Sequence, residues 1–227
     1  MNENHTSPRM TVSLAGAAVF ATLAALMTLA NAQIPFPLIP YLQIDFSEIP
    51  IMISFFLFGP TSAIVAAVIQ WLFLNVRGAD APLGPALKFA AVLSTLLGFW
   101  VGNQVYRSLK GNKVHPTFAL STMLGGGVLL RVVAMVAANY LVLVYVAPIF
   151  FGADYLGFAR FTLEKSIGLH FTSDTMVLTY TLLFTGLYNL VNLLVGAVPA
   201  GLIVSPVSGS FKHITSIDAW LARNMKS

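Results

Sequence analysis

The sequence predicts an all-α integral membrane protein with six transmembrane helices and an ordered, proline-rich outer loop between helices 1 and 2. Of its 227 residues, 57% are apolar and only 9% are charged, whereas a soluble domain carries about 25% charged residues. The apolar residues form runs of roughly twenty, the length of a membrane-spanning helix, and not the alternating strands of a membrane barrel. The prolines at positions 35, 37, 40 and 50 interrupt these runs and predict the loop.

Composition also restricts the chemistry of the protein. Cysteine is absent, which excludes disulfides, thiolate nucleophiles and cysteine metal sites. The four histidines are scattered without metal-ligand spacing, and no Walker or Gly-x-Ser-x-Gly motif occurs. The net charge is +4, and the positions of the basic residues along the chain indicate membrane topology and not an anionic ligand. We therefore expect no metal, no cofactor and no nucleic-acid partner.

The first helix is expected in the apolar run from Thr11 to Ala30. The residues that follow imitate a signal-peptide cleavage site, but the run is long enough to span the membrane and favours a retained helix. Within it, small residues recur every four positions, at Ala17, Ala21 and Ala25. They share one face, so another helix can approach closely. This stripe indicates packing within the chain or docking of a partner protein.

The segment from Pro35 to Pro60 cannot continue the first helix, because proline lacks a backbone donor and fixes φ. We expect an ordered irregular loop. It carries Asp45 and Glu48, so it must lie at a membrane surface or line a cavity, as the lid or floor of a binding site. Paired carboxylates can perform acid–base chemistry. Their place immediately before an apolar run, however, favours a helix cap.

Five further apolar segments follow the loop. The first two, 49–58 and 61–76, are separated by Gly59-Pro60. The first of these spans only about 15 Å, so its neighbours complete a tilted span or the pair forms a re-entrant hairpin. The remaining helices are expected at 86–106, 118–146 and 176–204, and the connection 148–174 has room for a short surface helix.

Lysine and arginine positions predict the orientation in the cell membrane. With the amino terminus inside, the larger set is cytoplasmic: Arg9, Arg107, Lys110, Lys113, Lys212, Arg223 and Lys226. The smaller set is outside: Arg77, Lys88, Arg160 and Lys165. The positive-inside rule therefore favours cytoplasmic tails at 1–10 and 206–227 around a six-helix membrane domain at 11–205. The proline-rich loop then faces the source of an imported solute.

Polar residues inside the apolar runs are candidates for a site. Three amides lie at comparable depth in the last two helices: Asn139, Asn189 and Asn192. Hydrogen bonds between helices would explain any one of them, but the three together favour a flat heterocyclic ligand, on which Tyr140 and Tyr188 can stack. Arg131 lies near mid-membrane and is expected to pair with a partner group or to touch ligand. Lys88 either extends to the surface or reaches into the site.

These motifs, taken together, resemble a known family. The loop Ile-Pro-Tyr-Leu-Gln-Ile-Asp-Phe-Ser-Glu-Ile-Pro at 39–50, Phe58-Gly59-Pro60, Asn139-Tyr140 and Tyr188-Asn189 are similar to the substrate-binding S components of energy-coupling factor (ECF) vitamin transporters. The riboflavin-specific branch is the best match. The resemblance covers roughly residues 11 to 205, and the loop through Pro60 is its most specific part.

The resemblance implies a transport subunit that captures a vitamin at its outer face and is not an enzyme. Such a subunit has no ATPase activity of its own and associates with a transmembrane coupling protein and two ATPase subunits in the plasma membrane. The alanine stripe matches the family's surface for the coupling protein. Ala17, Ala21 and Ala25 are therefore predicted partner-docking residues.

The resemblance also implies a binding site for riboflavin. Asn139 and Asn189 match family positions that bond the uracil-like edge of the ring, whereas Lys88 and Asn192 depart from the family pattern. The predicted substrate-binding residues are Leu42, Gln43, Lys88, Phe89, Asn139, Tyr188, Asn189 and Asn192. The ring would lie against Leu42, Phe89 and Tyr188, while Gln43 and Lys88 would meet the ribityl hydroxyls.

Three alternatives stay open. The departures at positions 88 and 192 are compatible with an S component for another flavin or heterocyclic vitamin. An intramembrane enzyme would use Asp45, Glu48 or His170, but these residues lack a recognised catalytic spacing. A stand-alone secondary transporter would ordinarily show inverted repeats, and the two halves of the sequence show none.

Overall fold

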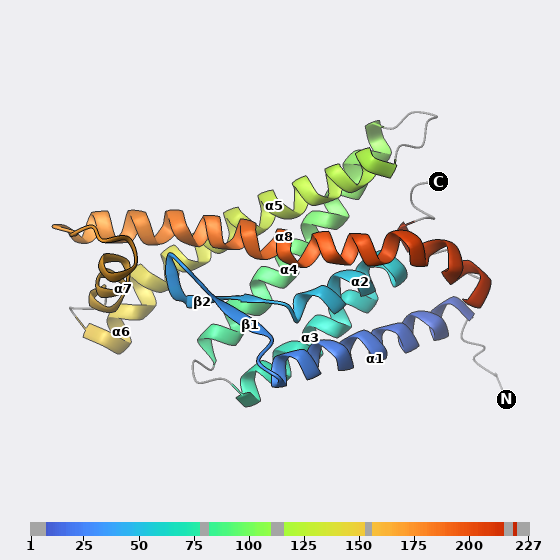
Figure 1. Ribbon diagram of the computed structural model, residues 1–227, viewed down its shortest axis with the longest axis horizontal. Coiled ribbons are helices and arrows are strands. Elements are labelled where there is room, and N and C mark those ends of the chain that lie inside the picture. Colours follow the sequence, from blue (N-terminus) through green and yellow to red (C-terminus); the bar gives the residue numbers. More distant parts are fainter. Residues whose placement is uncertain (1–7, 78–81, 110–115, 153–155, 216–219, 222–227) are drawn as a thin grey trace.

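The computed structural model describes residues 8–77, 82–109, 116–152, 156–215 and 220–221. Its elements in order are α1 (Pro8–Leu29), β1 (Gln33–Phe36), β2 (Ile39–Asp45), α2 (Glu48–Phe58), α3 (Pro60–Arg77), α4 (Leu83–Leu109), α5 (Pro116–Leu141), a π-helical turn (Val142–Val146), α6 (Ala147–Phe151), α7 (Gly157–Ile167) and α8 (Asp174–Thr215). Figure 1 shows α8 running along nearly the whole length of the bundle, with the β1–β2 hairpin and α7 towards one end.

The long helices are those of a membrane protein. Within the described part of the chain, four helical stretches are long and apolar enough to cross a bilayer: Met10–Leu29, Leu83–Leu109, Phe118–Ile149 and Asp174–Val207. Two shorter apolar helices, α2 and α3, lie between the first and second of these. The structure is thus mostly helical, as predicted, with four helices long enough to span a membrane among the described residues, and the six-span topology stays a prediction.

The proline-rich segment after α1 is more regular than expected. We predicted an irregular loop, and this was wrong for residues 33–45, which form an antiparallel hairpin with Gln33 opposite Asp45 and Pro35 opposite Gln43. A two-stranded ribbon tolerates prolines because both strands are edges and half of their N–H groups need no partner. The register shifts immediately after Pro35, where the chain turns back through Pro37.

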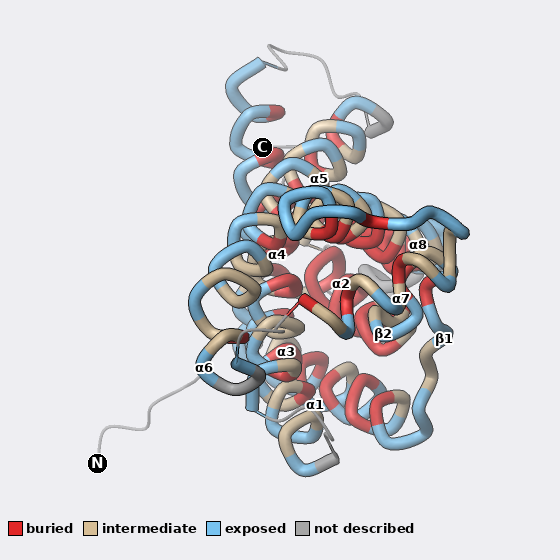
Figure 2. Tube along the Cα trace, turned by 90° about the vertical axis from the view of Figure 1, so that its left-hand side faces the viewer, coloured by how far each residue is buried: buried red, intermediate tan, exposed pale blue. Residues whose placement is uncertain are grey.

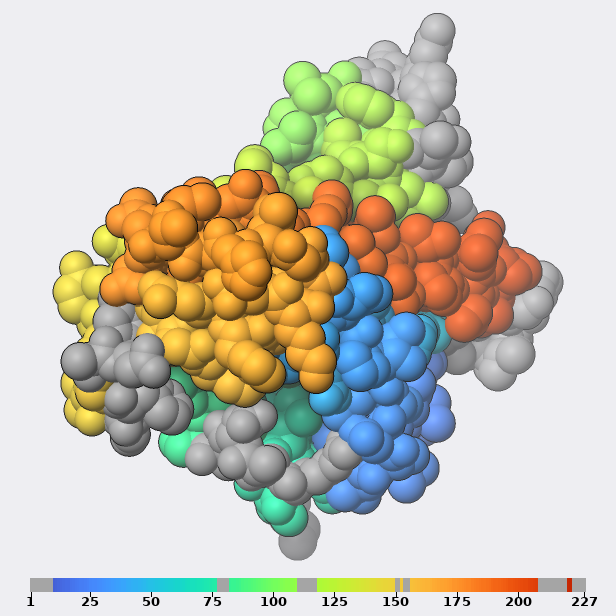
Figure 3. All heavy atoms as spheres, turned by 60° about the vertical axis from the view of Figure 1, so that its left-hand side comes forward, coloured from blue at the N-terminus to red at the C-terminus, as the bar shows by residue number. Residues whose placement is uncertain are grey.

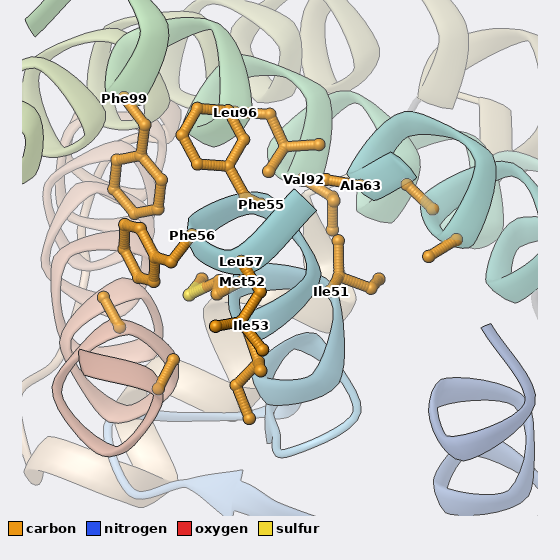
Figure 4. Close-up of a cluster of buried hydrophobic side chains, with 14 of the residues drawn as sticks. Ile51, Met52, Ile53, Phe55, Phe56, Leu57, Ala63, Val92, Leu96 and Phe99 are labelled. Atoms are coloured by element: carbon orange, nitrogen blue, oxygen red, sulfur yellow. The ribbon is translucent and has the colours of Figure 1, made fainter. Parts of the chain in front are cut away.

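Helix α2 forms the centre of the core. Nine of its eleven residues are buried, which is typical of a helix that is enclosed by others on every side. Figure 4 shows its side chains packed against α4. The Phe55 ring meets Phe99 edge-on at 5.6 Å, and the Phe56 ring stacks on Phe99 at 5.4 Å. Figure 2 shows that buried residues gather on the inner faces of the surrounding helices.

Helices α4 and α5 cross in direct backbone contact. A Cβ atom added to Gly98 would lie 2.4 Å from the Gly126 carbonyl oxygen, and one added to Gly102 would lie 2.1 Å from that of Thr122. Small residues allow membrane helices to approach this closely. The crossing fixes the position of the second half of α5, which carries Arg131 and Asn139.

The alanine stripe of α1 lies inside the protein. Ala17, Ala21 and Ala25 are all buried, and α1 packs on α2 and α3. The docking prediction for these three residues needs correction, because their small side chains serve close packing within the chain and are not available to a partner. The exposed side of α1 instead carries larger apolar groups, including Val19 and Leu26.

The last helix is longer than the sequence suggested. We expected an end near residue 204, whereas α8 continues to Thr215 through Pro199 and Pro206. Beyond it, Leu221 is buried and Trp220 packs edge-on against Phe55 at 5.0 Å. Residues after 205 therefore contribute to the core, and the predicted domain limits stay untested. The short helix expected between 148 and 174 is present as α7.

Candidate functional site

A cavity of about 430 Å³ lies between the β1–β2 hairpin and helices α3, α4, α5 and α8. Six of the eight predicted substrate-binding residues line it: Leu42, Gln43, Lys88, Asn139, Tyr188 and Asn189. The cavity wall also includes Arg131 and Asp45. Binding sites for small molecules typically enclose 300–1,000 Å³, so the predicted residues surround a space of suitable size.

Two predicted residues lie elsewhere. The Phe89 ring stacks on Trp71 at 5.4 Å and packs against the core. Its neighbour Lys88 faces the cavity, and consecutive helical residues point in different directions. Asn192 is fully buried behind the cavity wall, where it accepts a hydrogen bond from the Asp45 N–H at 2.8 Å. The prediction that Phe89 and Asn192 line the site is therefore not met in this structure.

Four charged residues form a buried cluster beside the cavity. The Arg131 guanidinium donates through Nη1 and Nη2 to both carboxylate oxygens of Glu48, at 2.6 and 3.0 Å. The Lys88 ammonium lies 2.7 Å from Glu48 Oε1 and 3.1 Å from Asp45 Oδ2. Two acids thus face two bases, and their charges balance. The expectation that Arg131 pairs with a partner group is confirmed.

Glu48 receives a further bond from Asn192, whose Nδ2 donates to Oε1 at 2.8 Å. Glu48 does begin α2, as the helix-start interpretation predicts, but its carboxylate binds side chains of α4, α5 and α8. Asp45 has the local role instead, since its Oδ1 accepts from the Ser47 N–H and hydroxyl at 2.7 and 2.5 Å. The Glu48 and Arg131 positions are 83 residues apart, so no local spacing could reveal the pair.

The amides on the cavity wall are oriented by their own helices. Asn189 donates to the Thr185 carbonyl oxygen at 2.9 Å and accepts from Arg131 Nε at 3.1 Å. Asn139 donates to the Met135 carbonyl oxygen at 2.8 Å. Among the described residues, the Asn139 carbonyl oxygen has no protein donor, so it can accept a hydrogen bond from a ligand.

The hairpin is fastened to the helices at the end nearest the cavity. The Tyr188 hydroxyl donates to the Gln43 carbonyl oxygen at 2.8 Å. Asn192 and Lys88 hold the backbone and side chain of Asp45. The Phe36 ring lies edge-on to Tyr188 at 5.7 Å. These contacts make the hairpin one wall of the cavity, as expected for a lid or floor.

The site offers recognition groups and lacks a free acid–base pair. Both carboxylates are held by cations, and His170 is exposed away from the cavity beside Glu164. No cluster of potential metal ligands occurs among the residues that the structure describes. Apolar groups, several carboxamides and balanced charges favour binding of a neutral, planar molecule over catalysis.

No family model matches the chain. Two curated proteins do: the chain is 33% identical over 154 residues to the riboflavin transporter RibU of Streptococcus thermophilus, with 65% of each protein covered. It is 30% identical over 113 residues to the riboflavin transporter RibU of Staphylococcus aureus, with 50% of this chain and 55% of that one covered. The matches thus span less than two thirds of either relative.

A solved structure described as the S component of a bacterial ECF transporter shares the fold. Its TM-score is 0.55 at 19% sequence identity, and the match covers 89% of this chain and 98% of that one. At this identity the likeness shows the fold. With the two sequence matches, it confirms the resemblance to riboflavin-type S components that the motifs indicated.

Proposed function

From an S-component fold and sequence similarity to riboflavin transporters, we propose that this chain is the substrate-binding S component of an ECF-type importer that captures riboflavin. The observation that carries the proposal is the convergence of six predicted contact residues on one cavity beneath the hairpin. These residues come from β2, α4, α5 and α8, so only the folded chain brings them together.

The cavity provides a matching environment for each part of riboflavin. The flat ring lies against Leu42, Met135 and Tyr188, and the Asn139 carbonyl oxygen accepts from the ring N–H. Gln43 and Lys88 meet the ribityl hydroxyls. A neutral hydrogen bond contributes about 0.5–1.5 kcal/mol net, while nanomolar affinity requires about 12 kcal/mol. Burial of the ring must therefore supply most of the binding energy.

The balanced charge cluster supports a neutral ligand. Arg131 and Lys88 are both held by carboxylates, so neither cation needs a charged group from the ligand. Asn189 is held by Arg131, so the cluster presents this amide in a fixed orientation to the ring edge. Asn192 acts one layer behind, through Asp45 and Glu48.

The same proposal extends to topology and partners. The chain crosses the plasma membrane six times, with α2 and α3 completing the two shorter passes and both termini in the cytoplasm. It works with a membrane coupling protein and two ATPase subunits, and has no ATPase activity or cofactor of its own. Because the alanine stripe is buried, a partner that approaches α1 would meet its outer side, around Val19 and Leu26.

Equilibrium binding to the purified protein tests this function. Titrations with riboflavin, FMN, thiamine and biotin should show tight binding of riboflavin, and Asn139→Ala should weaken it about three- to tenfold through loss of one hydrogen bond. The matched control is Asn75→Ala, because Asn75 makes the same bond to the carbonyl oxygen four residues earlier but does not line the cavity.

The alternative function is an S component for a different heterocyclic vitamin. It rests on Lys88, which stands in the cavity wall where the family often has asparagine. Tight binding of thiamine or biotin without riboflavin binding would establish this alternative. Unchanged riboflavin affinity in Asn139→Ala would contradict the site itself.

A further inference from the structure

A second cavity, of about 370 Å³, lies between β2 and α7. Figure 3 shows the surface of this part of the chain, with the α7 region in gold and orange against the blue hairpin. Three aromatic rings line the cavity, Tyr41 from β2 and Phe158 and Phe161 from α7. Tyr41 belongs to the motif at 39–50, whereas the sequence motifs include neither phenylalanine.

The rings are exposed although α7 is firmly packed. One face of α7 buries Ala159 and Leu163, whereas Phe158 and Phe161 on the other face are 67% and 63% exposed. The Tyr41 and Phe158 rings lie 5.5 Å apart at 41°. Exposed aromatic groups that gather around a cavity typically mark a site of interaction.

Tyr41 connects this cavity to the candidate riboflavin site, because its side chain lines both cavities. The α7 cavity also has a polar edge at Lys165, whose ammonium lies 5.9 Å from the Phe161 ring centre. Aromatic walls with a few polar groups suit a planar heterocycle that carries hydroxyl or carbonyl groups. The two neighbouring cavities therefore suit the same class of ligand.

We propose that the cavity between β2 and α7 is a vestibule, in which the incoming flavin stacks before it passes Tyr41 into the main cavity. This proposal rests on the function proposed above, since riboflavin is its ligand. Stacking on exposed rings needs no exact orientation, because every planar heterocycle offers an aromatic face. The vestibule therefore raises the frequency of productive encounters and leaves selection to the amides of the main cavity.

A vestibule has a kinetic signature that a structural role lacks. Its stacking contacts persist in the transition state for passage into the main cavity and are absent from the final complex, so their loss slows association and dissociation by the same factor. The equilibrium dissociation constant then stays unchanged. A residue that only supports the fold would instead change the affinity, the stability or both.

Stopped-flow quenching of riboflavin fluorescence tests the proposal. For the wild-type protein, the observed rate should level off at high riboflavin concentration, as expected for two steps. For Phe158→Ala and Phe161→Ala, association and dissociation should each fall about tenfold, the factor expected from loss of one stacking partner. Phe158→Leu keeps an apolar group without a ring and should show the same loss.

The control is Phe118→Ala, since Phe118 is 42% exposed on α5 but lines neither cavity. An unchanged equilibrium constant in every variant verifies that the protein is folded. Unchanged rates in the two α7 variants would overturn the vestibule. The same unchanged rates are expected if lipid covers these rings, and that result would overturn the vestibule as well. Failure of the wild-type protein to bind riboflavin would instead overturn the proposed function, and the vestibule with it.

Discussion

Replacing Glu48 with glutamine should destabilise the protein far more than a surface charge change. Glu48 is fully buried and its carboxylate receives Arg131, Lys88 and Asn192. Glu48→Gln keeps the shape but leaves two buried cations with Asp45 as their remaining carboxylate. Removal of one partner from a buried ion pair costs about 3–5 kcal/mol.

The matched control is Asp174→Asn, because Asp174 pairs with Arg160 at 2.5 Å on the surface, with 67% and 36% of the side chains exposed. An exposed pair contributes about 0–1 kcal/mol. The free energy of unfolding in mixed detergent micelles, measured by denaturant titration, compares the two variants. A loss below about 1 kcal/mol in Glu48→Gln, equal to that in the control, would refute the role given to the charge cluster.

A double replacement separates the charge effect from local packing. If Glu48 and Arg131 act as a pair, Glu48→Gln combined with Arg131→Gln should cost less than the sum of the two single changes, since neither charge is then left unpaired. The same denaturant titrations give this coupling energy. Additive losses would show that the two side chains act independently.

Two further predictions concern the hairpin and the helix crossing. Tyr188→Phe removes the hydrogen bond to the Gln43 carbonyl oxygen and should weaken riboflavin binding about three- to tenfold in a fluorescence titration. The control is Tyr140→Phe, because Tyr140 is exposed. An equal loss of affinity in the control would contradict the role given to the Tyr188 hydroxyl. Gly98→Ala places a methyl group 2.4 Å from the Gly126 carbonyl oxygen and should cost about 1–3 kcal/mol of unfolding free energy. Gly125→Ala, where a methyl group meets open space, should leave that free energy unchanged or raise it by up to about 1 kcal/mol, because alanine favours a helix more than glycine does. Similar losses in both variants would exclude a packing cause.

The fold class was predictable because it depends on composition and run length. A long apolar run can be assigned to a spanning helix by comparing its length with the thickness of the hydrocarbon layer. The helices α1, α4, α5 and α8 therefore begin close to the expected positions. The hairpin was not predicted, since its pairing depends on contacts with Tyr188 and Asn192, about 145 residues away. Propensity alone could not reveal those contacts.

The site was predictable where a polar residue in an apolar helix also lies on the helix face that borders the cavity. Asn139 and Asn189 are polar residues in apolar helices, and both line the cavity. Asn192 shares that polarity, but Asp45 and Glu48 satisfy its amide, so it lies behind the wall. The alanines of α1 show the same limit: spacing identifies a face for close packing and does not identify the neighbour.

The carboxylate of Glu48 has a mechanical consequence for the whole bundle. Glu48 is the first residue of α2, and its carboxylate binds side chains from α4, α5 and α8. These four helices therefore share one anchoring point. If α4, α5 or α8 slid along α2, it would break its bond to Glu48, so this carboxylate restrains three of the helical walls of the cavity together. None of these bonds comes from the hairpin tip, Leu38 to Tyr41, so we expect a ligand to enter by displacing this tip and not by parting the helices.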